Sequence, residues 1–451
     1  MTLRRVAVVA TMVLALSGAA CTGSSGPDPT AALSGPSSGS PSGSSRTPDL
    51  DGAEVSVLGL WSGPERDAFA AVTGAWEDAT GATVAWTGSR DLAGDLAAAV
   101  ADGVPPDVAV LPNPGLLRDL VGAGALLPLD DLLDPAAVAR DYPAAWTDLG
   151  TVDGALYALP VKVTDRSTVW YSSAAFDAAG YAVPGTWDDL VAWAGDAVAD
   201  GRTPLSVVAP RGPGSGWALT DGVASLVLGG CGPATYDAWV AAEVHWTDAC
   251  VRRSFDRFLT LVTAPGRVLG GVQAILTTGD AEGVLPVFAD PPEAYAYPMA
   301  SFAQAFVTEA YPDLVPGTGY DWFAFPAVDP ALAGATTVGA DLVAALRDTP
   351  AARSFLAYVT GADAQARWAG LGGYTSVNRG VPASAYPDAV ARSVAEHLTG
   401  AEVVRFGAGD AMPAEVQSAW SAAMLRLVQD PGGLDGELAS LTDVAAAAAD
   451  G

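Results

Sequence analysis

Tryptophans stand close to charged and amide side chains in several loops of this chain, a pattern that suits ligands with both polar groups and apolar faces. The sequence has 13 Trp, against 12 Tyr and 11 Phe. Sugars present C–H faces that lie on flat aromatic rings, and a buried site must satisfy their hydroxyls with donors and acceptors. Trp217 is the leading candidate, because it follows the Gly-rich stretch 212–216 and precedes Asp221 by four residues. A tryptophan packed under its own loop is the alternative.

Other candidates stand where expected strands end, the place where open α/β sheets bind ligands. Trp61, Ser62 and Glu65 follow the first expected strand, where a side chain and the free N–H groups of a helix can bind a hydroxyl. Ser62 and Glu65 also match the S-x-x-E capping box, so a purely local role stays open. Arg90 follows the second expected strand and is either a hydroxyl donor or a solvated surface residue.

Lys162 lies among apolar strand residues, so its charge must reach a cleft, a partner or water. Trp170 and Trp420 are weaker aromatic candidates. Trp187 follows an expected N-cap at Thr186 and is predicted to lie in the core.

The composition excludes several classes of function. The net charge of −29 repels phosphate backbones, so nucleic acid is not an expected partner. Two His and three Cys leave little material for a transition-metal site, and no nucleotide-binding glycine signature is present, so neither metal nor cofactor is expected. A secreted glycoside hydrolase, which needs two carboxyl groups across the glycosidic bond, stays an alternative, although no pair stands out and no catalytic residue is assigned. A binding protein for a non-sugar solute, such as an amino acid or a polyamine, is the other alternative.

The first twenty residues are predicted to be a signal peptide. Arg4 and Arg5 precede an apolar run over 6–16, and small residues occupy 17–20. Cys21 at the expected cleavage point resembles the acylated cysteine of bacterial lipoproteins, although Gly18 departs from the aliphatic residue usual there. Ordinary secretion with an unmodified Cys21 is the alternative. Segment 21–50 is predicted to be a Ser-, Gly- and Pro-rich linker that tethers a folded part to a membrane.

With Cys21 assigned to the lipid, Cys231 and Cys250 remain as a pair. Disulfides persist in exported proteins, so a Cys231–Cys250 bridge is predicted; two separate buried thiols are the alternative.

The elements that must position these residues alternate between strands and helices. Apolar runs at 55–60, 84–86 and 107–111 predict strands, and Phe69, Val72 and Trp76 share one face of a helix that begins near Ser62 and ends at Gly81. Near-continuous apolar strands that alternate with helices predict a parallel α/β sheet. A further strand is predicted at 168–171, and long helices are predicted at 351–368 and 416–428. No membrane-spanning segment is expected after residue 21.

Seven segments in order then give the chain a resemblance to the extracellular solute-binding proteins (family 1) of carbohydrate ABC transporters, most of all to the α-glucoside branch. These segments are 61–65 (WSGPE), 105–112 (PPDVAVLP), 153–162 (DGALYALPVK), 214–221 (GSGWALTD), 289–292 (ADPP), 301–302 (SF) and 372–380 (GGYTSVNRG). The resemblance implies a two-lobed, periplasmic-binding-protein-like fold of type II with the ligand cleft between the lobes. It adds Asn113, Ser301, Phe302 and Tyr374 to the predicted site.

The resemblance also implies lobe 1 at 51–165 and 323–372, and lobe 2 at 166–322 and 373–451. It implies a monomeric receptor, lipid-anchored on the extracellular face of the membrane, that captures a sugar or short oligosaccharide of the α-glucoside kind. The receptor would deliver its ligand to ABC permease subunits and would catalyse no reaction.

Overall fold

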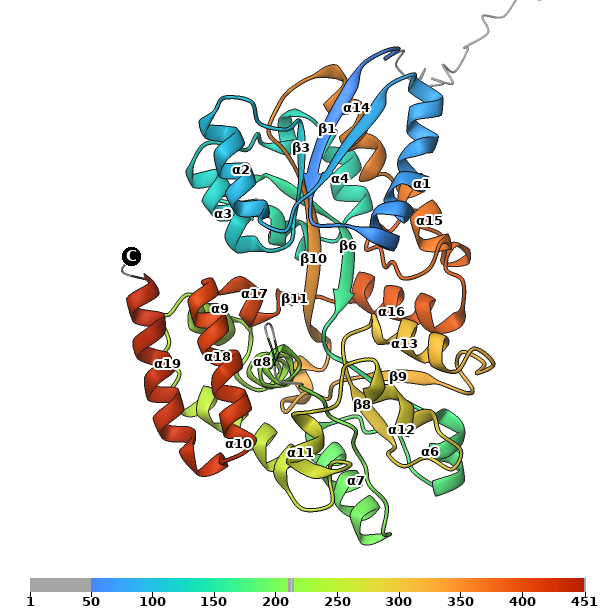
Figure 1. Ribbon diagram of the computed structural model, residues 1–451, viewed down its shortest axis with the longest axis vertical. Coiled ribbons are helices and arrows are strands. Elements are labelled where there is room, and N and C mark those ends of the chain that lie inside the picture. The colour runs from blue at the N-terminus through green and yellow to red at the C-terminus, as the bar shows by residue number, and fades with distance from the viewer. Residues whose placement is uncertain (1–49, 210–211, 213–214, 450–451) are drawn as a thin grey trace, which may run out of the picture. The chain divides into compact units, whose positions relative to one another are not determined.

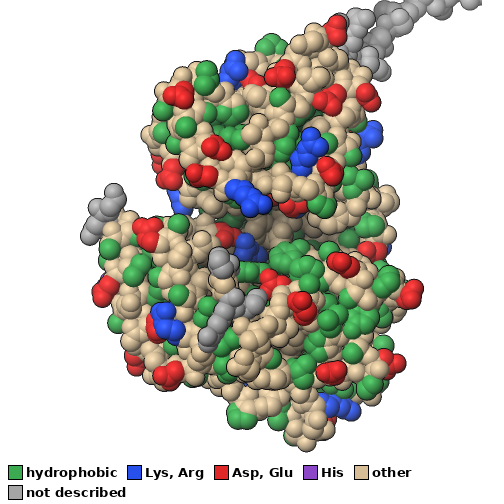
Figure 2. All heavy atoms as spheres, in the orientation of Figure 1, with side chains coloured by type: hydrophobic (Ala, Val, Ile, Leu, Met, Phe, Trp, Pro, Cys, Tyr) green, Lys and Arg blue, Asp and Glu red, His purple; other side chains and the backbone are tan. Residues whose placement is uncertain are grey.

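The computed structural model describes residues 50–209, 212 and 215–449. The predicted signal peptide, Cys21 and residues 22–49 lie outside the described residues. The described part forms two lobes joined by chain segments that pass between them (Figure 1), and the space-filling view shows a hollow where the lobes meet (Figure 2). This is the expected two-lobed α/β fold.

The first lobe is built on a six-stranded sheet with the order β11-β10-β3-β1-β2, in which β6 also pairs with β10. Its strands are β1 (Glu54–Gly59), β2 (Thr83–Gly88), β3 (Val108–Leu111), β6 (Ala158–Asp165), β10 (Ala335–Ala345) and β11 (Val403–Phe406). A two-stranded hairpin lies beside it, formed by β4 (Thr151–Val152) and β5 (Ala155–Leu156). The helices of this lobe are α1 (Gly63–Thr80), α2 (Leu92–Ala101), α3 (Pro114–Gly122), α4 (Pro135–Asp141), α5 (Ala144–Thr147), α14 (Pro350–Val359) and α15 (Ala362–Gly370).

The sheet is mixed, so the prediction of a parallel sheet is correct only for part of it. β1 pairs in parallel with β2 and with β3, as the strand–helix alternation predicts. β10 runs antiparallel to both β3 and β6. β10 returns to the sheet from the other lobe, so no short crossover helix fixes its direction.

Local sequence explains the helices that position the cleft. α1 begins after Ser62, has Pro64 in its first turn and ends at Gly81, which takes the left-handed conformation at φ 76°. Its buried face includes Phe69, Val72 and Trp76, as predicted. The single long helix predicted at 351–368 is wrong: α14 ends at Val359 and α15 starts at Ala362, since Gly361 takes an extended conformation as the N-cap of α15.

The second lobe holds a three-stranded antiparallel sheet in the order β8-β7-β9. Its strands are β7 (Thr168–Tyr171), β8 (Ala296–Pro298) and β9 (Asp321–Ala324). Its helices are α6 (Ser173–Ala179), α7 (Trp187–Ala199), α8 (Trp217–Cys231), α9 (Pro233–Val240), α10 (Ala249–Thr263), α11 (Gly271–Ile275), α12 (Leu285–Phe288), α13 (Ala303–Ala310), α17 (Ala408–Ala411), α18 (Ala414–Leu427) and α19 (Leu434–Ala449).

α16 (Ala389–Gly400) lies at the junction of the two lobes, because Val390 packs in a second-lobe core and Val394 in the first-lobe core. The 3-10 helices are η1 (Leu129–Asp131), η2 (Asp148–Gly150), η3 (Glu282–Val284), η4 (Pro330–Leu332), η5 (Ala383–Ala385) and η6 (Pro431–Gly433).

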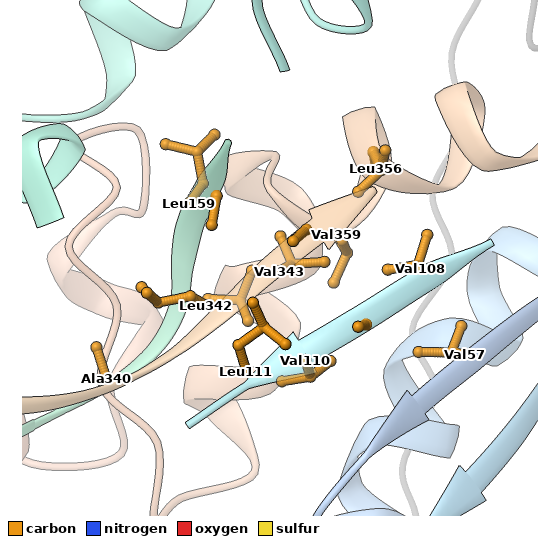
Figure 3. Packing of buried hydrophobic residues seen from close by; sticks show 14 of the residues in the cluster. Val57, Val108, Val110, Leu111, Leu159, Ala340, Leu342, Val343, Leu356 and Val359 are labelled. Carbon is orange, nitrogen blue, oxygen red and sulfur yellow. The ribbon is translucent and has the colours of Figure 1, made fainter. Parts of the chain in front are cut away.

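Separate hydrophobic cores fill the two lobes. The first-lobe core joins strand residues such as Val57, Val110 and Leu342 to Leu356 and Val359 of α14 (Figure 3). The second-lobe cores take in Trp187, as predicted, and also Trp170 and Trp420, which are fully buried. Those last two tryptophans therefore pack in the protein interior and are not ligand platforms.

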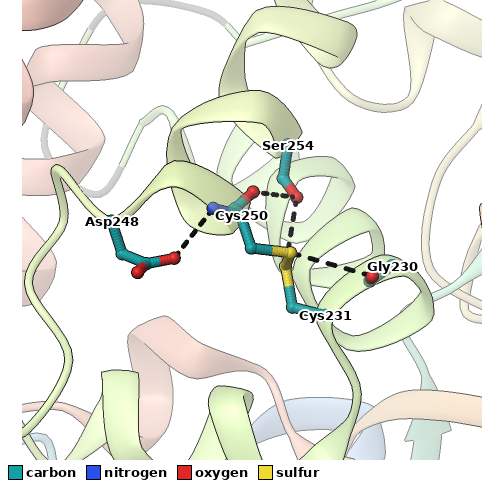
Figure 4. The surroundings of a disulfide bond; sticks show 5 residues. All are labelled: Gly230, Cys231, Asp248, Cys250 and Ser254. Atoms are coloured by element: carbon teal, nitrogen blue, oxygen red, sulfur yellow. Dashed lines mark hydrogen bonds between the residues drawn. A yellow bond between two sulfur atoms is a disulfide. The ribbon is translucent and has the colours of Figure 1, made fainter.

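A disulfide joins Cys231 at the end of α8 to Cys250 in the first turn of α10, as predicted (Figure 4). Asp248 caps α10 and accepts a hydrogen bond from the backbone N–H of Cys250. The bridge fixes the far end of α8, whose opposite end carries Trp217.

Besides the junction helix α16, three segments carry the chain between the cores. They join Val163, Val338 and Phe406 in the first-lobe core to Val169, Phe323 and Ala408 in a second-lobe core. The predicted boundaries of the two lobes stay a prediction. No helix among the described residues has both the length and the apolar character needed to span a bilayer.

Candidate ligand-binding site

Two adjoining cavities lie where the lobes face each other, and they share Lys162, Thr164 and Phe302. We call the cavity lined by Trp217 the inner cavity, with a volume of about 440 Å³, and the cavity lined by Ser301 and Tyr374 the outer cavity, with a volume of about 590 Å³. The inner lining consists of Pro112, Asn113, Lys162, Thr164, Arg166, Trp217, Phe302, Gly339, Ala340, Asp341, Asp410 and Gln417. Basic and acidic side chains are visible inside the hollow (Figure 2). The cleft therefore draws its walls from both lobes.

The first-lobe wall carries a charged group centred on Lys162 of β6. Its ammonium forms an ion pair with Glu65 of α1, and Asp341 of β10 stands opposite Lys162 in the strand register. The indole N–H of Trp61 donates to Asp341 Oδ2 at 3.0 Å. Burial raises the pKa of Asp341, while Lys162 and the Trp61 hydrogen bond oppose the rise. This wall thus offers one ammonium group and two carboxylates to a ligand.

The second-lobe wall is centred on Arg166, which follows β6 directly. Its Nη1 donates to both carboxylate oxygens of Asp221 at 3.3 and 3.4 Å, and its Nη2 donates to Asp410. Gln417 donates to the other oxygen of Asp410 at 3.1 Å. Burial raises the pKa of Asp221 to about 7; Arg166 opposes the rise and Asp410 adds to it. Two carboxylates therefore share one guanidinium in a partly dehydrated site.

Trp217 and Phe302 supply the aromatic part of the cleft. Trp217 is the first residue of α8, directly after Gly216 at φ 93°. Its ring centroid lies 5.8 Å from that of Phe302, and the Arg166 Cζ lies 5.9 Å from the Trp217 centroid. Phe302 is 41% exposed although it is a large apolar side chain. Two partly exposed aromatic rings beside charged groups suit a ligand that has both C–H faces and hydroxyls.

The structure brings most of the predicted residues to this cleft. Trp217, Asn113, Lys162 and Phe302 line the inner cavity, and Asn113 also caps α3 by accepting from the Leu116 N–H at 2.9 Å. Asp221 lies directly behind this lining, because it holds Arg166.

The outer cavity contains the predicted Glu65, Ser301 and Tyr374. Ser301 is tied to the segment between the lobes, since its hydroxyl accepts from the Asp165 N–H at 3.1 Å. Tyr374 is buried, stacks on Trp368 and donates its hydroxyl to the Val161 carbonyl, so it supports the wall of the cavity.

Besides Asp221, three predicted residues lie outside both linings: Trp61, Ser62 and Arg90. Trp61 is 3% exposed and packs in the first-lobe core, so it reaches the cleft only through its hydrogen bond to Asp341. Ser62 and Arg90 are exposed on the surface and line neither cavity. The predicted capping box is absent, because Ser62 makes no side-chain cap and Glu65 pairs with Lys162.

Sequence reasoning missed Arg166, Asp341, Asp410 and Gln417. A signal existed for Asp341, which is the only charged residue in the eleven residues of β10, just as Lys162 is an isolated cation among apolar residues. Asp410 lies in a short helix that follows a glycine, and nothing in its local sequence distinguishes it. Its role depends on the packing of α17 against α8 and α18, which only the tertiary structure reveals.

A larger cavity of about 730 Å³ lies between α3 in the first lobe and α9, α18 and α19 in the second. Its lining is mainly apolar, with Trp239 and Trp246 at one side and Val404 and Phe406 at another. A ligand rich in hydroxyls would lose its hydrogen bonds to water there with few replacements. We therefore assign the candidate site to the charged cleft. No group of three or more His, Cys, Asp or Glu residues within the described ranges is arranged to hold a metal ion.

Comparison with known proteins agrees with this architecture. Residues 62–366 match the family described as bacterial extracellular solute-binding protein. The chain is 33% identical over 390 residues to the osmoprotective compounds-binding protein GgtB of Synechocystis sp., covering 86% of this chain and 91% of that protein. It is 32% identical over 380 residues to the alpha-glucosides-binding periplasmic protein AglE of Rhizobium meliloti, covering 82% of this chain and 81% of that protein.

Solved structures show the same fold at lower identity. The bacterial solute receptor AcbH aligns with a TM-score of 0.73 at 20% identity, over 88% of this chain and 99% of that chain. A chitin oligosaccharide binding protein aligns with a TM-score of 0.71 at 20% identity, over 88% and 99% of the two chains. Because the family matches over more than half of the sequence and a relative matches over most of its length, this chain belongs to the bacterial extracellular solute-binding proteins.

Proposed function

We propose that this protein is the sugar receptor of an ABC importer and that it binds an uncharged sugar of the α-glucoside kind. The observation that carries the proposal is the cleft itself, in which Trp217 and Phe302 face charged side chains from both lobes. The alpha-glucosides-binding periplasmic protein AglE, which shares 32% identity over most of both chains, supports the choice of α-glucosides.

The charges of the cleft argue for an uncharged ligand. Its two cations, Lys162 and Arg166, are each already paired with a carboxylate. An anionic sugar would meet the acidic charge that remains after these pairs are counted. Neutral hydroxyls, in contrast, accept from Lys and Arg and donate to Asp without adding net charge to a buried site.

The size of the cleft supports a disaccharide or a short oligosaccharide. The inner cavity of about 440 Å³ and the outer cavity of about 590 Å³ meet at Phe302. One sugar unit would occupy the inner cavity between Trp217 and the charged walls. Further units would extend past Phe302 toward Ser301 and Gln304.

Capture would proceed by closure of the lobes, since a ligand between two walls contacts both of them only when they approach. The closed receptor would then present the ligand to permease subunits in the membrane. Capture and delivery in this proposal leave the sugar chemically unchanged.

The location follows from the same proposal. We infer acylation of Cys21 and a tether over residues 22–49, which would hold the folded part near the extracellular face of the membrane. The receptor would act as a monomer, because one chain supplies both walls of the cleft.

A titration with recovery of the sugar tests the proposal. The protein is mixed with trehalose, sucrose, maltose and maltotriose, with glucuronate and spermidine as charged controls, and binding is measured by calorimetry and thermal shift. We expect one or more of the neutral sugars to bind and to be recovered unchanged. At a hundredfold excess over Kd, the bound sugar should add about 2.7 kcal/mol to the free energy of unfolding. Sugar cleaved in proportion to the protein would favour a hydrolase, and binding of spermidine alone would overturn the sugar assignment.

A further inference from the structure

Arg166 occupies the place where the three segments between the lobes come together. Its backbone N–H donates to the Thr337 carbonyl at 2.9 Å, and the Gly407 N–H donates to the Val338 carbonyl at 2.8 Å. These two hydrogen bonds link the first crossing segment to the second, and the second to the third. Any change in the angle between the lobes therefore changes the surroundings of Arg166.

The Arg166 side chain lies against two glycines, one from each of the other crossing segments: Gly407 is beside the end of its aliphatic stem and Gly339 is beside its guanidinium. A Cβ atom on Gly339 would lie 3.1 Å from Arg166 Nε, and one on Gly407 would lie 3.2 Å from Arg166 Cδ. Both distances are tighter than an ordinary contact, so either methyl group would push against the arginine. Neither glycine has a positive φ, so the backbone at both positions suits alanine. What the two glycines supply is space for the arginine side chain.

The guanidinium at the end of this stem lines the inner cavity. It is held by Asp221 of α8 and Asp410 of α17, and it lies near the face of Trp217. Its side chain is 21% exposed, so a ligand in the cavity can reach it. The Arg166 side chain thus lies among the segments that connect the lobes, and its charged end lines the cavity proposed to bind the ligand.

We propose that Arg166 is a positioning residue that couples ligand capture to movement of the hinge, with Gly339 and Gly407 as the two sides of its clamp. The coupling rests on the proposed sugar-binding function. When the lobes move, the spacing of the clamp changes and shifts the guanidinium relative to Asp221 and Asp410. A ligand that contacts the guanidinium in the closed arrangement therefore stabilises that arrangement.

A double-mutant cycle tests the proposal, because it separates an effect carried by Arg166 from general strain. Arg166→Ala, Gly407→Ala and the double variant are titrated with whichever panel sugar binds the unmodified protein. Each single variant should weaken binding by roughly tenfold or more, since a buried charge pair is lost or displaced. The double variant should bind like Arg166→Ala, because the one tight contact of the added methyl group is with the arginine, whereas its distance of 3.6 Å to Asp221 Oδ1 is an ordinary contact. Gly334→Ala is the matched control, as its Cβ would meet nothing within 4 Å, and it should bind normally.

Additive losses in the double variant would overturn the proposal, as would unchanged affinity together with a lowered Tm in Arg166→Ala. A second measurement needs no sugar. Amide hydrogen exchange in peptides covering 336–340 and 405–409 should be several-fold faster in sugar-free Arg166→Ala than in Gly334→Ala. Equal exchange rates in Arg166→Ala and Gly334→Ala would overturn the coupling, whether or not a sugar binds. Faster exchange in Arg166→Ala, with no sugar binding to the unmodified protein, would refute only the proposed function.

Discussion

Asp221 gives this protein a pH dependence of stability whose sign and size follow from its surroundings. The carboxylate is buried beside Arg166 and Asp410, and its pKa rises from 3.8 to about 7 on folding, mainly through burial. At a pH between these two pKa values, Asp221 is protonated in the folded protein and ionised in the unfolded chain. The free energy of unfolding therefore falls as pH rises from about 4 to 7, and the contribution of this group is lost above its folded pKa.

The size of the effect follows from the shift of about three units. At about 1.4 kcal/mol for each unit, the change is on the order of 4 kcal/mol. A folded part of about 400 residues unfolds with an entropy of roughly 0.8 kcal/mol/K, so this free energy corresponds to a Tm change of about 5 °C.

Calorimetry of the unmodified protein and of Asp221→Asn at pH 4 to 8 checks this prediction. The difference in Tm, unmodified minus variant, should fall as pH rises, because asparagine does not titrate and the other groups cancel. Asp348→Asn is a control in which the Tm difference from the unmodified protein should change with pH in the opposite direction. The Arg353 hydrogen bond lowers the pKa of Asp348, so its stabilising contribution is lost as pH falls. A difference between Asp221→Asn and the unmodified protein that does not change with pH would refute the reasoning.

Three further predictions concern the cleft, the disulfide and the anchor. In calorimetry, Trp217→Ala should weaken sugar binding by about 1–3 kcal/mol with little loss of stability. In thermal unfolding, the core variant Trp187→Ala should lose about 3–5 kcal/mol of stability. Normal binding together with early unfolding in Trp217→Ala would contradict the assignment of the site. Replacing Cys231 and Cys250 together by Ser should lower the free energy of unfolding by about 3 kcal/mol, for a bridge between residues 19 apart, and leave the Kd for sugar unchanged; an unchanged midpoint in denaturant would argue against the bridge. Intact mass of the native protein should show acylation of Cys21, and Cys21→Ser should appear in the medium; a free thiol at a native N-terminus would rule out the anchor.

The sequence carried enough local information to predict the first-lobe elements and part of the cleft. The 3.6-residue spacing of Phe69, Val72 and Trp76 predicted the buried face of α1, and the pairing of Cys231 with Cys250 followed from their number and the export signal. Trp217 stood out because a glycine-rich stretch precedes it. For α1 and Trp217 a short stretch of sequence contains the physical cause, whereas the disulfide followed from the composition of the whole chain.

Features that depend on distant segments escaped prediction. The direction of β10 is set by its return from the second lobe, which no local pattern encodes. Glu65 has the spacing of a capping residue, yet it pairs with Lys162, which lies 97 residues away. Arg166 and Asp410 are separated by 244 residues, so only the packing of α17 brings their charges together.

A crystal structure of the protein with a bound α-glucoside tests the central claim most directly. We predict one sugar unit in the inner cavity, with a C–H face on Trp217 or Phe302 and hydroxyls bonded to Lys162, Asp341 or Arg166. The ligand should contact both lobes at once. A sugar held by one lobe alone, or bound in the apolar cavity beside Trp239, would contradict the account.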